Sequence, residues 1–166
     1  EEKKKIKKMV IERVNGRIPI LLGVGGNNTR AIVETLKNDD FTGVDAILSV
    51  VPYYNKPSQE GIYQHYKAIS EATDLPIVLY NVPGRTGVNI KAETTLRIAR
   101  DFKNVIAIKE ASGDITQMDD IIKNKPANFD VISGDDGITF PLITLGAVGI
   151  ISVIGNAFPR EFSRMV

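Results

Sequence analysis

The sequence predicts an α/β fold made of about six consecutive β/α units. Short runs of apolar, often β-branched residues alternate along its 166 residues with longer segments of helical periodicity. The runs recur at intervals of roughly 25–30 residues, close to the length of one β/α repeat. Near-continuous apolar runs of this kind are typical of parallel strands covered on both faces. Two architectures contain such a series, a doubly wound sheet and a (β/α)8 barrel.

Six segments are predicted as strands because each is short, apolar and bounded by glycine, proline or polar residues. They are 18–24, 46–51, 77–80, 105–109, 129–133 and 148–153. The first ends in Gly23-Val24-Gly25-Gly26, which lacks the Gly-x-Gly-x-x-Gly spacing of a dinucleotide site. The dinucleotide-binding form of the doubly wound sheet therefore has no support.

Helical periodicity predicts a helix before the first strand and one in each interval between strands. These helices are 6–14, 29–36, 58–71, 92–102, 116–124 and 137–145. Thr29 is expected to cap the second helix, and Ser58 opens the third. Asp135 and Asp136 are interpreted as helix caps, because two adjacent carboxylates chelate one Mg²⁺ ion poorly from a strand end.

Composition narrows the classes of function. The formal net charge of +1 gives no electrostatic case for nucleic acid or an anionic membrane as a partner. Cysteine is absent, which excludes disulfides and thiolate metal sites, and the single histidine, His65, is expected to be structural. No apolar run is long enough to span a bilayer. We therefore expect no metal, no nucleic acid and no membrane, and a location in the cytoplasm.

Polar residues follow every predicted strand. They occupy 25–28, 53–56, 80–81, 109–110, 133–136 and 152. In parallel α/β folds the functional site lies at the carboxyl ends of the strands. The pattern therefore predicts one site assembled from several strand ends.

Lys109 has the most specific chemistry among these residues. Alternation along 105–109 places it on the same face as Val105 and Ala107. An exposed lysine has a pKa near ~10.4 and is protonated at neutral pH, whereas burial lowers the pKa and releases a nucleophilic amine that can form an imine with a ketone. The alternative is a strand-end lysine that extends its amine into solvent, which the pattern alone favours.

Tyr54, Tyr80 and Arg85 also lie just after predicted strands. A strand-end phenol can relay a proton during imine formation, or it can simply fill the end of a barrel. The guanidinium of Arg85, on a loop fixed by proline and glycines, can bind the carboxylate of a substrate or lie free at the surface.

Four motifs together resemble the dihydrodipicolinate synthase (4-hydroxy-tetrahydrodipicolinate synthase) family. They are Tyr-Tyr-Asn-Lys-Pro at 53–57, Asn-Val-Pro-Gly-Arg-Thr-Gly at 81–87, Ile-Lys-Glu-Ala-Ser-Gly-Asp at 108–114 and Ser-Gly-Asp-Asp at 133–136. The resemblance covers essentially the whole chain and keeps the order of the motifs. It implies an α/β (β/α)8 TIM barrel, of which residues 1–166 form a single domain containing strands three to eight.

The resemblance also implies an activity. Members of the family are lyases of the class I aldolase type that condense pyruvate with aspartate-4-semialdehyde through a lysine Schiff base, on the diaminopimelate route to lysine. They need no cofactor, and the expected assembly is a homotetramer built as a dimer of dimers. Carried over by position, Lys109 forms the Schiff base and Tyr80 donates and accepts protons beside it. Arg85 orients the carboxylate of the semialdehyde, and Tyr54 joins the proton relay through the tight dimer.

Four further positions are implied by the same resemblance. Gly134 and Ile151 line the pyruvate pocket, while Asn27 and Tyr53 belong to the dimer interface and to a cleft that binds lysine in many members. The acidic residue of that cleft has no counterpart near Ala31, so we expect weak lysine inhibition.

The sequence departs from the family pattern in one large respect. The family's Gly-Thr-Thr-Gly-Glu motif, which binds pyruvate, and its C-terminal helical region have no match. We expect about two barrel strands to lie outside this chain, mainly before residue 1. The six strands alone would form an open sheet, leave Lys109 in water with an ordinary pKa, and be inactive. N-acetylneuraminate lyase, 2-keto-3-deoxy acid aldolases and an inactive fragment remain alternatives, although the loop with Arg85 favours the semialdehyde.

Overall fold

The computed structural model, which describes residues 1–166, contains one six-stranded sheet in the order β1-β2-β3-β4-β5-β6. Every neighbouring pair is parallel. The strands are β1 (Leu21–Gly23), β2 (Ala46–Val50), β3 (Ile77–Asn81), β4 (Val105–Glu110), β5 (Asp130–Ser133) and β6 (Gly149–Ile150). The predicted series of parallel β/α units is thus confirmed.

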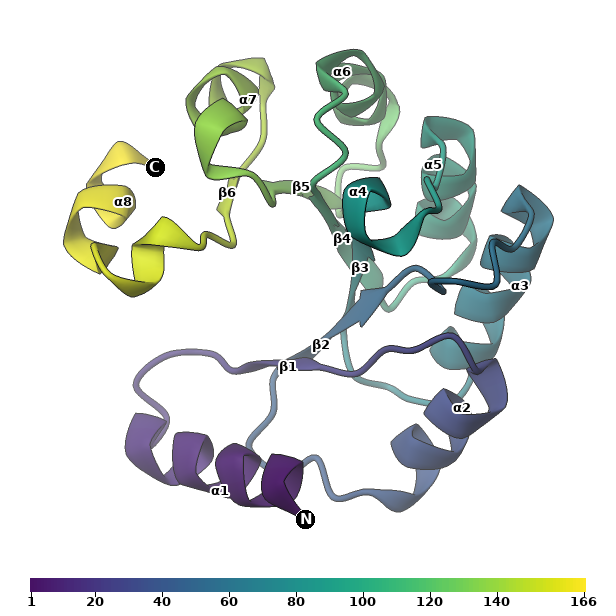
Figure 1. Cartoon of the computed structure of the whole chain (residues 1–166), viewed down its shortest axis with the longest axis vertical. Helices are drawn as coiled ribbons and strands as arrows, with labels where there is room; N and C mark the ends of the chain where they lie inside the picture. The colour runs from purple at the N-terminus through teal and green to yellow at the C-terminus, as the bar shows by residue number, and fades with distance from the viewer.

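Helices cover the outer side of this sheet. They are α1 (Glu2–Val14), α2 (Thr29–Asn38), α3 (Gln59–Ser70), α4 (Pro83–Thr86), α5 (Ala92–Asp101), α6 (Ile115–Asn124), α7 (Thr139–Leu145) and α8 (Pro159–Met165), with 3-10 turns η1 (Asp136–Ile138) and η2 (Ile154–Asn156). In Figure 1, α2, α3, α5, α6 and α7 form an arc around the strands, and α1 and α8 lie at the two ends of that arc. No helix combines the length and apolar character needed to cross a membrane.

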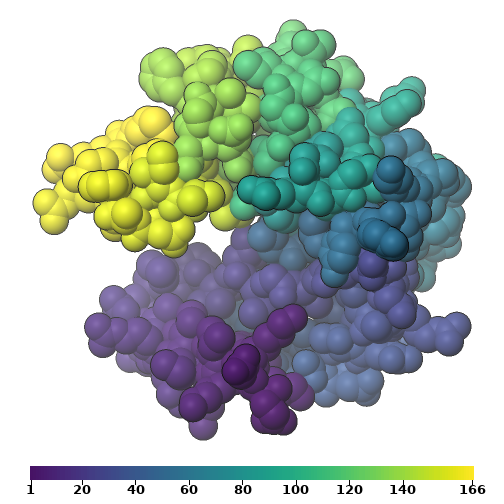
Figure 2. Space-filling view, viewed as in Figure 1, coloured from purple at the N-terminus to yellow at the C-terminus, as the bar shows by residue number.

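The sheet curves but does not close. Strand order follows chain order, so β1 and β6 are the two edge strands and do not pair with each other. Figure 2 shows a notch on this open side, between the N-terminal and the C-terminal parts of the chain. The strands therefore form part of a barrel, as predicted.

The main core lies between the sheet and the helices. Ile47, Leu79 and Ile108 come from successive strands and are fully buried against the helical layer. Tyr66 of α3 is also fully buried, and its hydroxyl donates a hydrogen bond of 2.8 Å to the backbone oxygen of Ser49. Burial raises the pKa of this phenol above its ordinary value, so it stays a donor.

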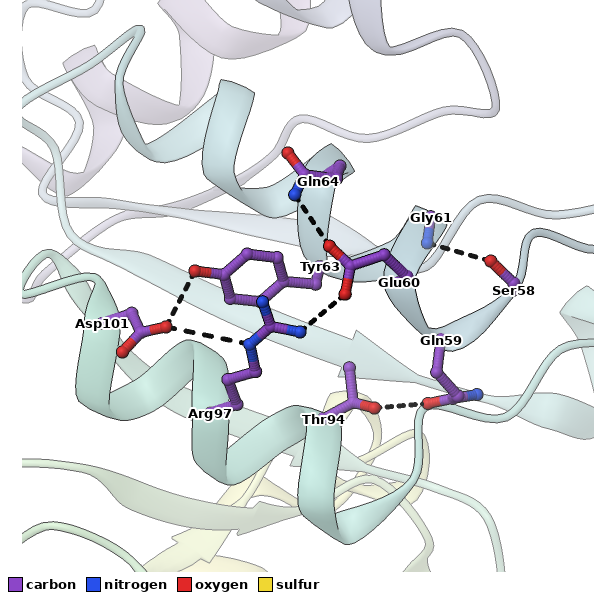
Figure 3. Close-up of polar contacts among 9 residues, drawn as sticks. All are labelled: Ser58, Gln59, Glu60, Gly61, Tyr63, Gln64, Thr94, Arg97 and Asp101. Carbon is purple, nitrogen blue, oxygen red and sulfur yellow. Dashed lines mark hydrogen bonds and ion pairs between the residues drawn. The ribbon is translucent and has the colours of Figure 1, made fainter.

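An exposed ion-pair cluster joins α3 to α5 (Figure 3). The Arg97 guanidinium stacks 3.5 Å from the centroid of the Tyr63 ring and donates to Glu60 at 2.6 Å. The Tyr63 hydroxyl donates to Asp101 at 2.7 Å. These contacts fix the spacing of two helices that follow β2 and β3.

Three details differ from the sequence-based expectations. Asn28, not Thr29, caps α2, because its side chain accepts from the Ala31 amide, whereas the Thr29 hydroxyl bonds to His65 Nδ1 at 2.7 Å. The expected strand at 148–153 is only two residues long. Its continuation is diverted because the amides of Val153 and Ile154 donate to the Asp136 carboxylate rather than to a strand.

The third difference concerns β4. Its ladder with β3 shifts register between Ile77 and Val78, so Ile77 pairs with Val105 and Val78 with Ala107. Val105 belongs to the core cluster with Ile108, and Ala107 does not. The prediction that Lys109 and Val105 lie on the same face of the sheet is therefore wrong, because the register shift interrupts the alternation of side chains along β4.

Candidate active site

The site is built on the carboxyl ends of β3 and β4. Tyr80 and Lys109 are paired in register on these neighbouring parallel strands, so their side chains share one face of the sheet. The Lys109 Nζ lies 4.4 Å from the centroid of the Tyr80 ring. The structure thus brings together the predicted nucleophile and the predicted proton-transfer residue.

The amine of Lys109 is half-buried. Burial lowers its pKa below the ordinary value, while the negative charge of Asp136 acts in the opposite direction. The expectation that an open sheet would leave this amine with an ordinary pKa was therefore wrong, because neighbouring strand ends already exclude part of the water. A lowered pKa raises the fraction of neutral, nucleophilic amine.

Gly134 supplies a wall beside Lys109. A Cβ atom at this position would lie 2.8 Å from the Ala111 Cβ and 3.0 Å from the Lys109 Cε. The loop after β5 therefore packs so closely against Ala111 and the lysine stem that a side chain here would force a neighbour to shift. Gly134 thus lies against the Lys109 side chain, and its place in a pyruvate pocket stays a prediction.

Asp136 has a role that the helix-cap interpretation missed. Asp135 does cap η1, since its carboxylate accepts from the Gly137 amide at 2.8 Å. The Asp136 carboxylate instead accepts from the amides that follow β6, and the Ser152 side chain is the largest cause that lowers the pKa of this carboxyl. Lys109 lowers the same pKa further. Asp136 thus ties two strand ends together and supplies negative charge near the lysine.

Arg85 lies on the short helix α4, just beyond β3, and is exposed. Gly87 ends this helix with a φ of 71°, and the Thr86 hydroxyl donates to the Val88 backbone oxygen at 2.9 Å. A hollow of about 460 Å³ is lined by Arg85, Tyr80 and Tyr53 among other residues. The loop therefore presents a cation to the same open space as the Tyr80 ring.

Tyr54 is not brought to Lys109. It has a positive φ of 73°, and the residue is 88% exposed. Its amide donates to the Thr86 backbone oxygen at 3.3 Å, which anchors the 53–56 loop on the loop of Arg85. Within this chain the Tyr54 phenol consequently points to solvent.

Two other predicted residues lie at the margins. Asn27 is exposed and lines a separate, larger hollow of about 630 Å³ between α1, β1 and α2, which contains none of the other predicted site residues. Lys109 lines neither hollow, but its amine lies against the ring of Tyr80, which lines the smaller hollow together with Arg85. We therefore place the predicted site residues around the smaller hollow. The amide of Ile151 donates to the Ser133 backbone oxygen at 2.9 Å, so Ile151 directly follows β6 at the strand ends.

Glu110 was not singled out by the sequence reasoning. Its carboxylate is fully buried and lies on the opposite face of β4 from Lys109, where it accepts from the side chains of Asn81 and Gln117 and from the Ser112 amide. Burial raises the pKa of this carboxyl, although these hydrogen bonds act against the increase. The sequence feature that could have indicated its importance is a charged residue at a position of a predicted strand that faces the helices.

No group of three or more His, Cys, Asp or Glu side chains is placed to hold a metal ion. The single histidine, His65, is buried between α2 and α3. Its burial lowers its pKa to about 4.

Fold and site together define a class of protein. A curved parallel sheet with outer helices, and a polar site at the carboxyl ends of its strands, is the arrangement of TIM-barrel proteins. The model of the family described as "Dihydrodipicolinate synthetase family" matches residues 1–166. The chain therefore belongs to the dihydrodipicolinate synthetase family, which has a TIM-barrel fold.

Comparisons with individual relatives and solved structures give the same family. The 4-hydroxy-tetrahydrodipicolinate synthase of Phocaeicola vulgatus is 88% identical over 165 residues, which are 99% of this chain and 56% of that protein. The protein of the same name from Parabacteroides distasonis is 82% identical and is also covered to 56%. The crystal structure of dihydrodipicolinate synthase from Thermotoga maritima superposes with a TM-score of 0.94 at 48% identity, over 98% of this chain and 56% of that one. The chain thus spans little more than half the length of these relatives.

Proposed function

We propose that this chain carries the Schiff-base site of a class I aldolase-type lyase that condenses pyruvate with aspartate-4-semialdehyde on the diaminopimelate route to lysine. The observation that supports it best is the half-buried Lys109 amine, with a lowered pKa, held against Tyr80 at neighbouring strand ends. The names of the close relatives point to the same reaction.

The chemistry follows from these two residues. The neutral Lys109 amine attacks the keto carbon of pyruvate, and the resulting carbinolamine loses water to form an imine. Tyr80, whose ring lies beside Nζ, donates a proton to the departing hydroxyl, which leaves as water and gives a protonated imine; the Tyr80 phenolate then takes the proton lost from the methyl carbon. The protonated imine then draws electrons from the methyl carbon. Loss of a proton there gives an enamine that attacks the aldehyde of the second substrate.

The remaining roles concern binding. Arg85 offers its guanidinium to the carboxylate of the semialdehyde, and Gly134 and Ile151 form one side of the pyruvate pocket. Tyr54, which is exposed in this chain, completes the proton relay from across a dimer interface that also contains Tyr53. We further propose a homotetramer in the cytoplasm and, with Asn27 in the lysine cleft, weak feedback inhibition by lysine.

The decisive experiment uses a graft, in which these 166 residues replace the matching segment of the Phocaeicola vulgatus relative. The graft is incubated with pyruvate and borohydride, and the adduct is located by peptide mass spectrometry. We expect it at Lys109. The Lys109→Arg variant, which keeps the charge but cannot form an imine, is the matched control.

Two outcomes would count against the proposal. An adduct on another lysine, or none in a folded graft, would remove Lys109 from the mechanism. Turnover of N-acetylneuraminate or a 2-keto-3-deoxy acid in place of the semialdehyde would assign the site to a sister aldolase.

A further inference from the structure

A network of neutral amides surrounds the buried Glu110 carboxylate. The Asn81 Nδ2 donates to both of its oxygens at 3.1 and 3.0 Å, the Ser112 amide donates at 2.8 Å, and the Gln117 Nε2 donates at 3.1 Å. No lysine or arginine forms an ion pair with Glu110. A buried carboxylate without a cationic partner is costly to desolvate, and a neutral side chain would avoid that cost. The presence of a buried carboxylate one residue after Lys109 therefore indicates that Glu110 has a specific role.

The network extends from Glu110 to both ends of the loop that carries Arg85. Asn81, which precedes the loop, accepts from the Ile90 amide at 3.2 Å and donates to the Asn89 side chain at 2.7 Å. The Asn89 side chain in turn donates to Gln117 at 2.9 Å.

Helix α3 joins the same network through Gln59. Its Nε2 donates to the Asn89 backbone oxygen at 2.8 Å, and its Oε1 accepts from Thr94 at 2.7 Å, a contact drawn in Figure 3. The carboxylate thus accepts from Asn81, Gln117 and the Ser112 amide, and the hydrogen bonds that continue from Asn81 and Gln117 reach the 82–90 loop and α3.

We propose that Glu110 is a positioning residue for the Schiff-base site, which fixes Lys109 and Tyr80 relative to each other and sets the entrance loop of Arg85. This inference rests on the proposed function. Tyr80 and Lys109 pair across the ladder on one face, and the next pair along the same strands, Asn81 and Glu110, is hydrogen-bonded on the other. A displacement of the second pair therefore moves the first.

The hydrogen-bond pattern requires a group that only accepts. In Glu110→Gln, the new amide nitrogen would face the Asn81 nitrogen in either orientation, together with the Gln117 nitrogen in one orientation or the Ser112 amide in the other. Neighbouring side chains, Asn81 among them, must therefore rotate to avoid opposed donors. Rotation of Asn81 turns its nitrogen toward the Ile90 amide and so breaks the tie to the loop. The variant has nearly the shape of the native residue and still disrupts the network.

The test measures Schiff-base formation in the graft by borohydride trapping over time, at saturating pyruvate, with the folded fraction determined by thermal melting. For Glu110→Gln we expect imine formation at Lys109 to slow by about tenfold to a hundredfold, the usual effect of a small misplacement of reacting groups. Half-saturation by pyruvate should change much less, because Glu110 lies on the face away from the substrate. Glu110→Asp keeps an acceptor-only group and should recover part of the rate.

Glu60→Gln is the matched control. It makes the same chemical change at an exposed carboxylate that also accepts from an amide and from Arg97, outside the site, and should leave the rate unchanged. A native rate in Glu110→Gln, or a loss explained entirely by its unfolded fraction, would overturn this inference while leaving the proposed function standing. Failure of the unsubstituted graft to label Lys109 would overturn both. If Glu110→Gln does not fold, the rate of Gln117→Leu decides, because this change removes one donor to the carboxylate and its tie to the Ile90 backbone oxygen, and a native rate there overturns the inference.

Discussion

Acidification is expected to destabilise the chain through His65. The His65 Nδ1 bonds to the Thr29 hydroxyl, and its Nε2 is buried without any partner. Burial lowers the pKa of His65 in the folded chain from 6.5 to about 4. Between these two values the unfolded chain binds a proton that the folded chain does not. The stabilising contribution is therefore complete above the unfolded value and is lost as the pH falls toward the folded one.

The magnitude follows from the two pKa values. Each unit of difference corresponds to about 1.4 kcal/mol, so the total loss at the acid limit is about 3 kcal/mol. Between pH values of about 7.5 and about 5 the linkage relation gives a loss of about 2 kcal/mol. This is a substantial part of the stability of an ordinary domain.

The assay is urea unfolding of the 166-residue chain at both pH values, for the native sequence and for His65→Asn. Asparagine places an amide where Nδ1 lies and can keep the bond to Thr29, but it does not titrate. The comparison is needed because Glu110, whose pKa is raised by burial, stabilises the fold as the pH falls. The native chain should lose about 2 kcal/mol more than the variant over this interval. An equal loss in both chains would refute the reasoning.

Three further predictions concern the site. Gly134→Ala should slow borohydride trapping at Lys109 in the graft and lower the free energy of unfolding by about 1–3 kcal/mol, because the added Cβ would overlap Ala111 and the lysine stem. An unchanged trapping rate would contradict the close approach. Arg85→Ala should lower kcat/KM for the semialdehyde by about tenfold, a modest loss because the arginine is exposed. Trapping of pyruvate at Lys109 should not change, and an equal loss of trapping would show that Arg85 acts on pyruvate instead. The 166-residue chain by itself should turn over pyruvate and semialdehyde far more slowly than the graft, because β1 and β6 are open edges and the interior face of the sheet lacks an opposing layer. Comparable rates would refute this expectation.

Local patterns in the sequence predicted most of the fold. The apolar runs at 46–51 and 77–80 correspond closely to β2 and β3, because strands covered on both faces select the same residue types along their whole length. Lys109 and Tyr80 could be placed at strand ends for the same reason. Their mutual contact then follows from the register of two adjacent parallel strands.

Features that depend on distant partners could not be predicted in this way. The Asp136 carboxylate takes the amides that would have extended β6, and its own neighbours do not reveal that choice. Asn28 caps α2, while the Thr29 hydroxyl bonds to His65 of another helix, a partner that the local sequence does not reveal. Glu110 was overlooked because its donors come from three separate segments, and the register shift near Val105 arises only when β3 and β4 pair.

The order of the strands has a consequence for how the site forms during synthesis. Each strand pairs only with the strands immediately before and after it in the chain, so no contact within the sheet has to wait for a distant segment. A ribosome that has released the chain through Glu110 has already delivered both members of the Tyr80–Lys109 pair and the Asn81 amide. The segments synthesised later carry Gln117, Gly134 and Asp136, and they pack against β3 and β4 after the register of these two strands has been set. We therefore expect the nucleophile to be aligned with Tyr80 before the later segments enclose it.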